Sequence, residues 1–157
     1  MEPRCRTTGF TLVEMMIVIV VIAILVGVLL PQFRGYQDEA NTQRARSELR
    51  TLATAVESYY IHNSNTLPAT LSALTSATPR IVSAIPNDPF NTTTAYQYAR
   101  DSGSPAVYYV IWSIGTDRAT DISTISTSGT ITESGGGDCT QDILVTNGTG
   151  TDGSSAC

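Results

Sequence analysis

The stretch Gly9-Phe10-Thr11-Leu12-Val13-Glu14 runs directly into the apolar segment Met15–Leu30, and this junction decides the fold of the chain. The 21 residues from Phe10 to Leu30 would span about 32 Å as an α-helix, close to the hydrocarbon thickness of a bilayer. An ionisable group at that depth costs several kcal/mol to insert. The sequence therefore predicts a transmembrane helix over residues 10–30, in which Glu14 has a functional reason to be present.

Two other interpretations of the apolar segment fit the sequence less well. A cleaved secretory signal has a shorter apolar core and a small-x-small site after it, whereas Leu29–Arg34 follows here. A helix buried in a soluble domain needs one polar face, and this segment is apolar on every side. Arg4 and Arg6 precede the segment and favour a cytoplasmic N-terminus, so the rest of the chain is expected outside the cytoplasm.

The pattern G-F-T-L-V-E closely resembles the processing site of type IV pilins and of their relatives, the type II secretion pseudopilins. The resemblance implies that a prepilin peptidase removes residues 1–9 by cutting between Gly9 and Phe10 and then methylates Phe10. It also implies that the Glu14 carboxylate meets the N-terminal amine of a neighbouring subunit during assembly. Pairing within one chain is a competing geometry, and a carboxyl that simply reaches water at the membrane interface is a third.

Pro31 marks the weakest turn of the predicted helix. A proline lacks the N–H that would bond the carbonyl of Gly27, and its ring clashes with that carbonyl. A simple kink explains the pair, since kinks at proline are common in membrane helices. The resemblance adds that helicity upstream of this proline can be lost in filaments, which makes Gly27 and Pro31 candidate assembly residues.

The helical pattern resumes after Pro31 and predicts one long helix over residues 10–62, followed by a globular head over residues 63–157. An apolar stripe with spacings of 4, 3, 4 and 3 is expected to pack against the head: Ala45, Leu49, Leu52, Val56 and Tyr59. The turn-forming residues 62–65 end the helix. By resemblance the fold class is α+β, a type IV pilin-like fold with a small antiparallel β-sheet.

Three short motifs in the head resemble the major pseudopilin of type II secretion. They are the turn Pro86–Phe90, the alternating strand Tyr96–Tyr98 and the strand ending Ser113–Asp117. Val107–Ile114 is the strongest strand, and Ile122, Ile125 and Ile131 predict further short strands. A flexible tail is expected from Gly135 onward, which departs from the pseudopilin pattern.

Charge and cysteine content narrow the class of protein. The chain has nine basic residues against fourteen acidic ones, which argues against nucleic-acid binding by bulk electrostatics. Cys5 lies in the predicted leader, which leaves Cys139 and Cys157. In an exported protein this pair is expected to form a disulfide, whereas a reducing compartment would leave two free thiols.

The loop after the Ser113–Asp117 motif is a candidate metal site. The resemblance implies structural calcium there, with Asp117 and Asp121 as the matching acids. Calcium prefers six to eight oxygen ligands, and the usual Gly-rich acidic insertion is missing here. A solvated acidic turn is the alternative.

The sequence contains no catalytic constellation, because its single histidine, His62, has no predicted partner. We therefore expect no enzyme. The resemblance implies a structural subunit, a homopolymer built through the N-terminal helix, with the prepilin peptidase, the inner-membrane assembly machinery and the membrane as partners. It would lie in the inner membrane before assembly and in an extracellular pilus or a periplasmic pseudopilus afterwards. The alternatives are the major pseudopilin of a type II secretion system and a single-pass membrane-anchored extracytoplasmic binding module.

Overall fold

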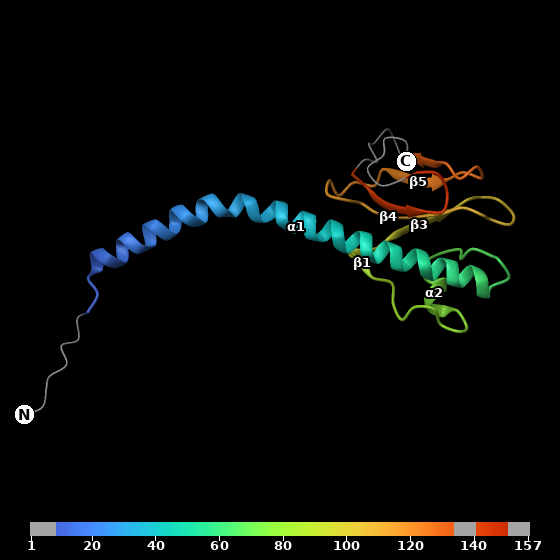
Figure 1. Ribbon diagram of the computed structural model, residues 1–157, viewed down its shortest axis with the longest axis horizontal. Coiled ribbons are helices and arrows are strands. Elements are labelled where there is room, and N and C mark those ends of the chain that lie inside the picture. The colour runs from blue at the N-terminus through green and yellow to red at the C-terminus, as the bar shows by residue number, and fades with distance from the viewer. Residues whose placement is uncertain (1–8, 134–140, 151–157) are drawn as a thin grey trace, which may run out of the picture. The chain divides into compact units, whose positions relative to one another are not determined.

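The computed structural model describes residues 9–133 and 141–150, with the side chains of residues 30–34 left aside. The chain divides into two compact units, one up to Asp38 and the other from Glu39 onward. Helix α1 (Leu12–His62), 51 residues long, belongs to both (Figure 1). It begins two residues after the start of the helix predicted over residues 10–62 and ends at the predicted residue.

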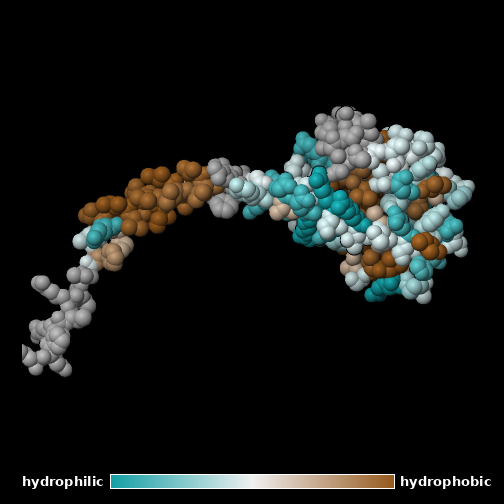
Figure 2. Space-filling view, viewed as in Figure 1, coloured by the Kyte–Doolittle hydropathy of each residue, from teal (hydrophilic) through white to brown (hydrophobic). Residues whose placement is uncertain are grey.

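The first unit is an apolar helix whose side chains have no protein around them. Every large apolar side chain from Leu12 to Leu29 is at least 46% exposed. In the face shown in Figure 2 they form a continuous apolar band. In the described part of the chain this is the one helix long and apolar enough to cross a membrane. Contact between such a surface and water is strongly unfavourable, so lipid or other protein chains must cover it.

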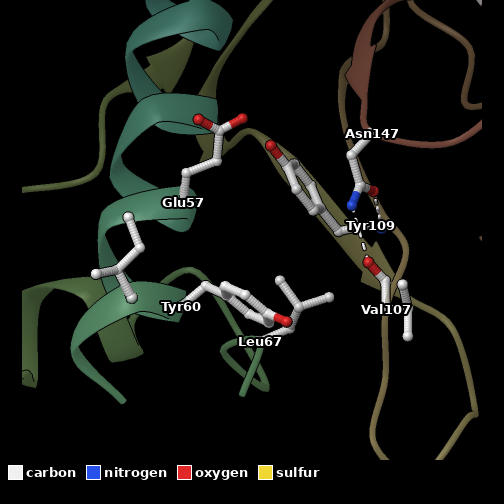
Figure 3. Close-up of a pocket in the computed structure, with 7 residues that line it drawn as sticks. Glu57, Tyr60, Leu67, Val107, Tyr109 and Asn147 are labelled. Atoms are coloured by element: carbon white, nitrogen blue, oxygen red, sulfur yellow. Dashed lines mark hydrogen bonds between the residues drawn. The ribbon is translucent and has the colours of Figure 1, made fainter. Parts of the chain in front are cut away.

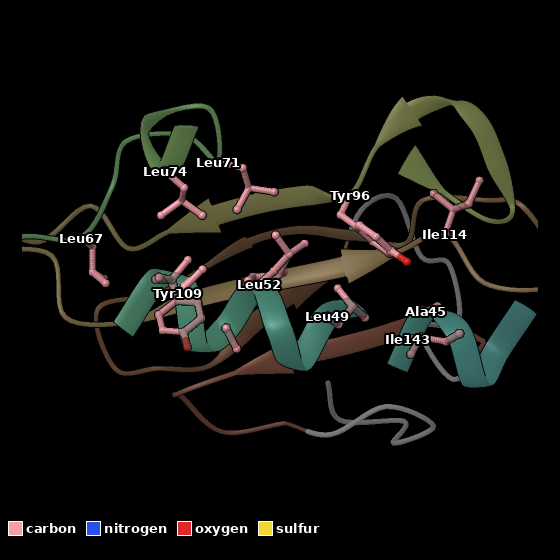
Figure 4. Packing of buried hydrophobic residues seen from close by; sticks show 14 of the residues in the cluster. Ala45, Leu49, Leu52, Leu67, Leu71, Leu74, Tyr96, Tyr109, Ile114 and Ile143 are labelled. Carbon is pink, nitrogen blue, oxygen red and sulfur yellow. The ribbon is translucent and has the colours of Figure 1, made fainter. Parts of the chain in front are cut away.

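In the second unit, α1 buries the predicted stripe. Ala45, Leu49 and Val56 have no exposed surface, and Leu52 is 2% exposed. They belong to one cluster with buried side chains of the head, and Figure 4 shows Ala45, Leu49 and Leu52 in it. Glu48 adds a polar contact, because it accepts hydrogen bonds from Arg44 Nε and from the hydroxyl of Tyr96, both at 2.7 Å. The predicted core-packing role of the stripe is confirmed.

The main sheet has three antiparallel strands in the order β3-β4-β7: β3 (Gln97–Arg100), β4 (Tyr109–Ser113) and β7 (Ile143–Thr146). All five residues of β4 are buried because both faces of the strand are covered. Tyr109 and Ile111 belong to the cluster that packs on α1. Val110 and Trp112 belong to a second cluster with Ile122 and other isoleucines. The alternation of the two sets follows from the two-residue period of a strand.

Smaller elements complete the head. Helix α2 (Ala73–Ser76) brings Leu74 into the main cluster. Strands β1 (Asn87–Asp88) and β2 (Asn91–Ala95) form one hairpin, and β5 (Ile122–Ile125) and β6 (Ile131–Glu133) form another. The predicted short isoleucine strands are therefore confirmed.

The prediction of a flexible tail from Gly135 onward is wrong for residues 143–146. There β7 lies beside β4 in the main sheet, with Ile111 opposite Val145 and Ser113 opposite Ile143. Residues 135–140 and 151–157 of the predicted tail lie outside the described residues. Ile143 and Leu144 are buried. The signal was the short apolar run Ile143–Val145, whose burial compensates for the polar residues around it.

Candidate functional site: the anchor helix and an acidic loop

Glu14 caps the start of its own helix. Thr11 is the N-cap residue, and both its N–H and its hydroxyl donate to Glu14 Oε2 at 2.8 Å. The N–H of Glu14 donates back to the Thr11 hydroxyl at 3.2 Å. This reciprocal arrangement is a capping box, which satisfies N–H groups left free at a helix start. In the single chain, the Glu14 carboxylate therefore already has a hydrogen-bond partner, Thr11.

The other assembly candidates lie on the same helix. Phe10 is 79% exposed beside the predicted cleavage point. Nothing lies within 4 Å of the position a Cβ would take at Gly9 or Gly27. The backbone of α1 is helical through Gly27 and Pro31. The roles of Gly9, Phe10, Glu14, Gly27 and Pro31 in processing and assembly stay predictions.

The predicted calcium loop connects β4 to β5. Asp117 is exposed, and its Oδ1 accepts from the N–H of Ala119 at 3.1 Å. Asp121 is only 8% exposed. Its N–H donates to Oδ2 of Asp142 at 3.2 Å. The structure thus adds a third carboxylate to this region, from the residue just before β7.

Asp142 was missed by the sequence reasoning, because the chain around it was expected to be flexible. It is 1% exposed. Burial raises the pKa of Asp142 to about 6; the Asp121 N–H opposes the shift, and the neighbouring carboxylates of Asp121 and Asp117 add to it. Its Oδ1 has no hydrogen-bond partner among the described residues. A buried oxygen without a donor is the kind of ligand atom that a hard cation accepts.

The three acids are not gathered around one point. In the described ranges, no group of three or more His, Cys, Asp or Glu side chains forms a ready-made metal centre. Their donor chemistry suits calcium, but Asp117 would have to turn inward to join the other two. The assignment of Asp117 and Asp121 to calcium therefore stays a prediction.

Asp88, in the Pro86–Phe90 motif, is a second buried acid whose role the sequence did not reveal. Its Oδ1 accepts from the Phe90 N–H at 2.9 Å and from the Ser113 hydroxyl at 2.8 Å. Its Oδ2 accepts from the Ile114 N–H at 3.0 Å. The carboxylate joins the β1–β2 hairpin to the end of β4, so its role is structural.

A cavity of about 380 Å³ lies between the end of α1 and the start of β4 (Figure 3). Its lining combines one carboxylate, Glu57, with aromatic and aliphatic side chains: Tyr60, Ile61, Leu67, Val107 and Tyr109. Burial, aided by the charge of Glu57, raises the pKa of Tyr109 to about 12. A phenol with that pKa stays protonated at neutral pH, so it offers no general base there.

Two other features expected from the sequence concern the cysteine pair and His62. Cys139 and Cys157 lie outside the described residues, so their disulfide stays a prediction. His62 is exposed at the end of α1, where its Nδ1 lies 2.7 Å from the carbonyl oxygen of Ser58. This places it in the helix-ending turn, as predicted.

Two family profiles match the chain in succession. The first, described as a prokaryotic N-terminal methylation motif, matches residues 4–30. The second, described as type II secretion system (T2SS), protein G, matches residues 32–134. Pro31, within α1, is the single residue between them.

Several curated proteins are similar to the chain. Type II secretion system core protein G of Vibrio cholerae is 28% identical over 120 residues, which cover 69% of this chain and 82% of the relative. Core protein G of Aeromonas hydrophila is 38% identical over 69 residues, covering 44% of this chain and 48% of the relative. A fimbrial protein of Pseudomonas aeruginosa is 38% identical over 72 residues, or 46% of this chain and 42% of the relative. No solved structure matches the chain.

Proposed function

Because the chain belongs to the type II secretion system protein G family, a family of pilin-like structural subunits, we propose that it polymerises into a type IV pilus-like filament after cleavage behind Gly9. The observation that carries the proposal is the anchor helix. Its apolar side chains are exposed on all sides in the single chain, and they need lipid before assembly and neighbouring helices after it.

The capping box suggests how the Glu14 carboxylate is stabilised before the subunit enters the filament. In the single chain, Thr11 supplies hydrogen bonds to the carboxylate. Cleavage after Gly9 would create an ammonium on Phe10 of every subunit, at a similar depth in the membrane. In the filament, the ammonium of a neighbouring subunit would then pair with the Glu14 carboxylate, because opposite charges attract strongly where water is excluded.

The head would form the outer layer of this filament. It has its own apolar core, built from the second half of α1 and the main sheet, and so does not depend on the anchor for its packing. A prepilin peptidase, an inner-membrane assembly machinery and copies of the chain itself are the partners that this function requires. The subunit would lie in the inner membrane first and in a filament outside the cytoplasm afterwards.

A short periplasmic pseudopilus is the second candidate. The protein G profile extends over the head as far as residue 134, which favours this form. The fimbrial relatives match about 46% of this chain and favour a surface pilus. Filament length distinguishes the two, since a pilus can be sheared from the cell surface and a pseudopilus stays within the envelope.

Electron microscopy of sheared cell-surface material and of envelope fractions tests the proposal, together with intact-mass analysis of the polymerised subunit. We expect filaments whose subunit begins at Phe10 and carries an N-methyl group. Filaments built from subunits that keep residues 1–9 would contradict the processing step. A membrane-bound subunit that never polymerises would instead favour an anchored binding module.

A further inference from the structure

The sequence Asn-x-Thr occurs twice in the head, in two different structural surroundings. The first copy is Asn91-Thr92-Thr93, at the start of β2, and the second is Asn147-Gly148-Thr149, directly after β7. Asn-x-Ser/Thr is the acceptor sequence for N-linked sugars on the surface of exported proteins. Such a short sequence also occurs by chance, so the contacts of each copy decide whether a glycan can be attached there.

The second copy is held by contacts with the rest of the head. Asn147 Oδ1 accepts from the N–H of Tyr109, and Asn147 Nδ2 donates to the carbonyl oxygen of Val107, both at 2.8 Å. Thr149 donates twice to the carbonyl oxygen of Gly129, through its N–H at 2.8 Å and through its hydroxyl at 3.1 Å. An enzyme cannot engage this asparagine and this threonine without breaking all four hydrogen bonds.

The first copy makes its side-chain contacts within itself. Thr93 donates to Oδ1 of Asn91 through its N–H at 3.3 Å and through its hydroxyl at 2.7 Å. Only the oxygen of an amide side chain accepts hydrogen bonds, so these two donors identify which atom is Oδ1. Nδ2 of Asn91 makes no hydrogen bond in the described part of the chain. The nitrogen that would receive a sugar is therefore free in the first copy and occupied in the second.

The β1–β2 hairpin holds the first copy on a fixed base. Phe90, the residue before Asn91, is 7% exposed and belongs to the cluster that packs on α1. The Asp88 carboxylate joins the same turn to the end of β4. Residues 92–95 are exposed, and among the described strands β2 pairs only with β1. The other edge of β2 is thus open to an enzyme that binds its acceptor as an extended strand.

We propose that Asn91 is the acceptor of an N-linked glycan, attached to the head outside the cytoplasm, and that Asn147 is not. The proposal goes beyond filament formation and rests on only one part of the proposed function, the export of the head. The donor it requires is an oligosaccharide linked to a polyprenyl pyrophosphate, and the enzyme is an oligosaccharyltransferase.

The transfer forms one bond and breaks one. Nδ2 of Asn91 bonds to the anomeric carbon of the first sugar, and the bond between that carbon and the pyrophosphate oxygen breaks. The polyprenyl pyrophosphate leaves with the electron pair of the broken bond, and the proton of Nδ2 passes to a base of the enzyme. An amide nitrogen is a weak nucleophile because its lone pair is delocalised. The two donors on Oδ1 draw electron density toward the oxygen and make the Nδ2 proton easier to remove.

Mass spectrometry of tryptic peptides tests the proposal, using the full chain isolated from the membranes of the cells that produce it. Cleavage after arginine separates the two copies, because Asn91 falls in the peptide 81–100 and Asn147 in the peptide 119–157. We expect the mass of a glycan on the peptide 81–100 and an unmodified amide at Asn147. Release of the glycan by a glycoamidase should leave an aspartate in place of Asn91.

Three variants test the structural reason for this choice. Thr93→Val keeps the shape of the side chain without its hydroxyl and should lose the glycan, whereas Thr93→Ser keeps the hydroxyl and should retain it. Thr149→Val is the matched control, because it removes the same hydroxyl from the second copy, and it should carry the glycan at the wild-type level. The fluorescence of Trp112, which is buried on β4, verifies that each variant is folded.

Protease added outside the cytoplasmic membrane separates failure of the proposal from failure of the proposed function. A head that this protease can reach but that carries no glycan at Asn91 overturns the proposal, whether or not the chain polymerises. A head that stays in the cytoplasm overturns the proposal together with the proposed export. A glycan on Asn147 of the folded chain, or one at the wild-type level in Thr93→Val, contradicts the distinction drawn between the two copies.

Discussion

At the residue scale, Asp88 shows how neutral donors stabilise a buried carboxylate. Three donors from the turn and from the end of β4 converge on its two oxygens: the N–H of Phe90, the hydroxyl of Ser113 and the N–H of Ile114. Hydrogen bonds to a charged acceptor are stronger than bonds between neutral groups. The aspartate in the Pro86–Phe90 motif is thus explained by a contact with a strand far along the chain.

We predict that Asp88→Ala lowers the free energy of unfolding of the head by about 2–4 kcal/mol, because two buried N–H groups lose their acceptor. Ser113→Ala removes only one donor and should cost about 1 kcal/mol. Urea denaturation followed by the fluorescence of Trp112, which is buried on β4, measures both. A value for Asp88→Ala within about 0.5 kcal/mol of the wild type would contradict the structural role given to this carboxylate.

Asp101 gives a prediction about pH. Burial raises the pKa of Asp101, but the N–H groups of Tyr108, Val107 and Gly103 outweigh it, and the pKa ends below its ordinary value of 3.8. A carboxyl with a lowered pKa stabilises the fold above its ordinary pKa, and this stabilisation is lost as the pH falls through the folded pKa. The carboxylate closes the loop between β3 and β4.

We therefore expect Asp101→Asn to be less stable than the wild type at pH 7, and the difference to shrink as the pH falls below about 4. Urea midpoints of both proteins, measured from pH 7 to pH 2.5, provide the test. A difference that stayed constant across that range would mean that the charge of Asp101 does not contribute.

At the scale of elements, Gly115 determines the path of the chain after β4. It also determines how closely Gln141, before β7, can approach that path. Its φ of +65° is a conformation that glycine adopts without strain, and a Cβ would strike the backbone of Gln141. Both partners in this contact are main-chain groups, so neither can move aside without shifting β7 against β4.

Gly115→Ala should consequently destabilise the head by about 2–4 kcal/mol, through backbone strain and displacement of the chain beside it. Gly35→Ala is the matched control, because Gly35 lies in α1 with nothing within 4 Å of its Cβ position. The control should leave the unfolding midpoint of the head unchanged. Equal midpoints for the two variants would show that the Gln141 contact is not restrictive.

At the scale of the whole molecule, the proposed assembly depends on one carboxylate, that of Glu14, in an apolar helix. The structure shows Glu14 capping its helix through Thr11. The pairing with a neighbour's Phe10 ammonium is a second, proposed role, and mutations can separate the two. Loss of the cap costs about 1 kcal/mol, whereas a buried charge left unpaired costs about 3–5 kcal/mol.

Glu14→Ala should leave membrane insertion intact and abolish filament formation, because the penalty recurs at every subunit. Thr11→Ala removes the hydroxyl of the capping box but keeps the carboxylate, and should still form filaments. Quantification of the subunit in membrane and filament fractions compares the two. Filaments at wild-type yield from Glu14→Ala would show that assembly does not need the ion pair. Loss of filaments in both variants would show that assembly needs the helix cap.

The sequence by itself determined the features that depend on local pattern. These are the apolar anchor, the stripe from Ala45 to Tyr59, the end of α1 at His62, the strands near Tyr96–Tyr98 and Val107–Ile114 and the short isoleucine strands. Each has a periodicity or a turn signal that spans only a few neighbouring residues, so it can be recognised without knowing what it packs against.

Only the tertiary structure decided which distant segments meet. The burial of β7 beside β4, the hydrogen bonds from Ser113 and Ile114 to Asp88 and the approach of Asp142 to Asp121 all join residues more than twenty positions apart. Strand β7 lies in a part of the sequence that is largely polar and locally resembles a solvated tail. It joins the sheet because β4 offers it a free edge, and because Ile143 and Leu144 gain more from burial than the polar backbone loses.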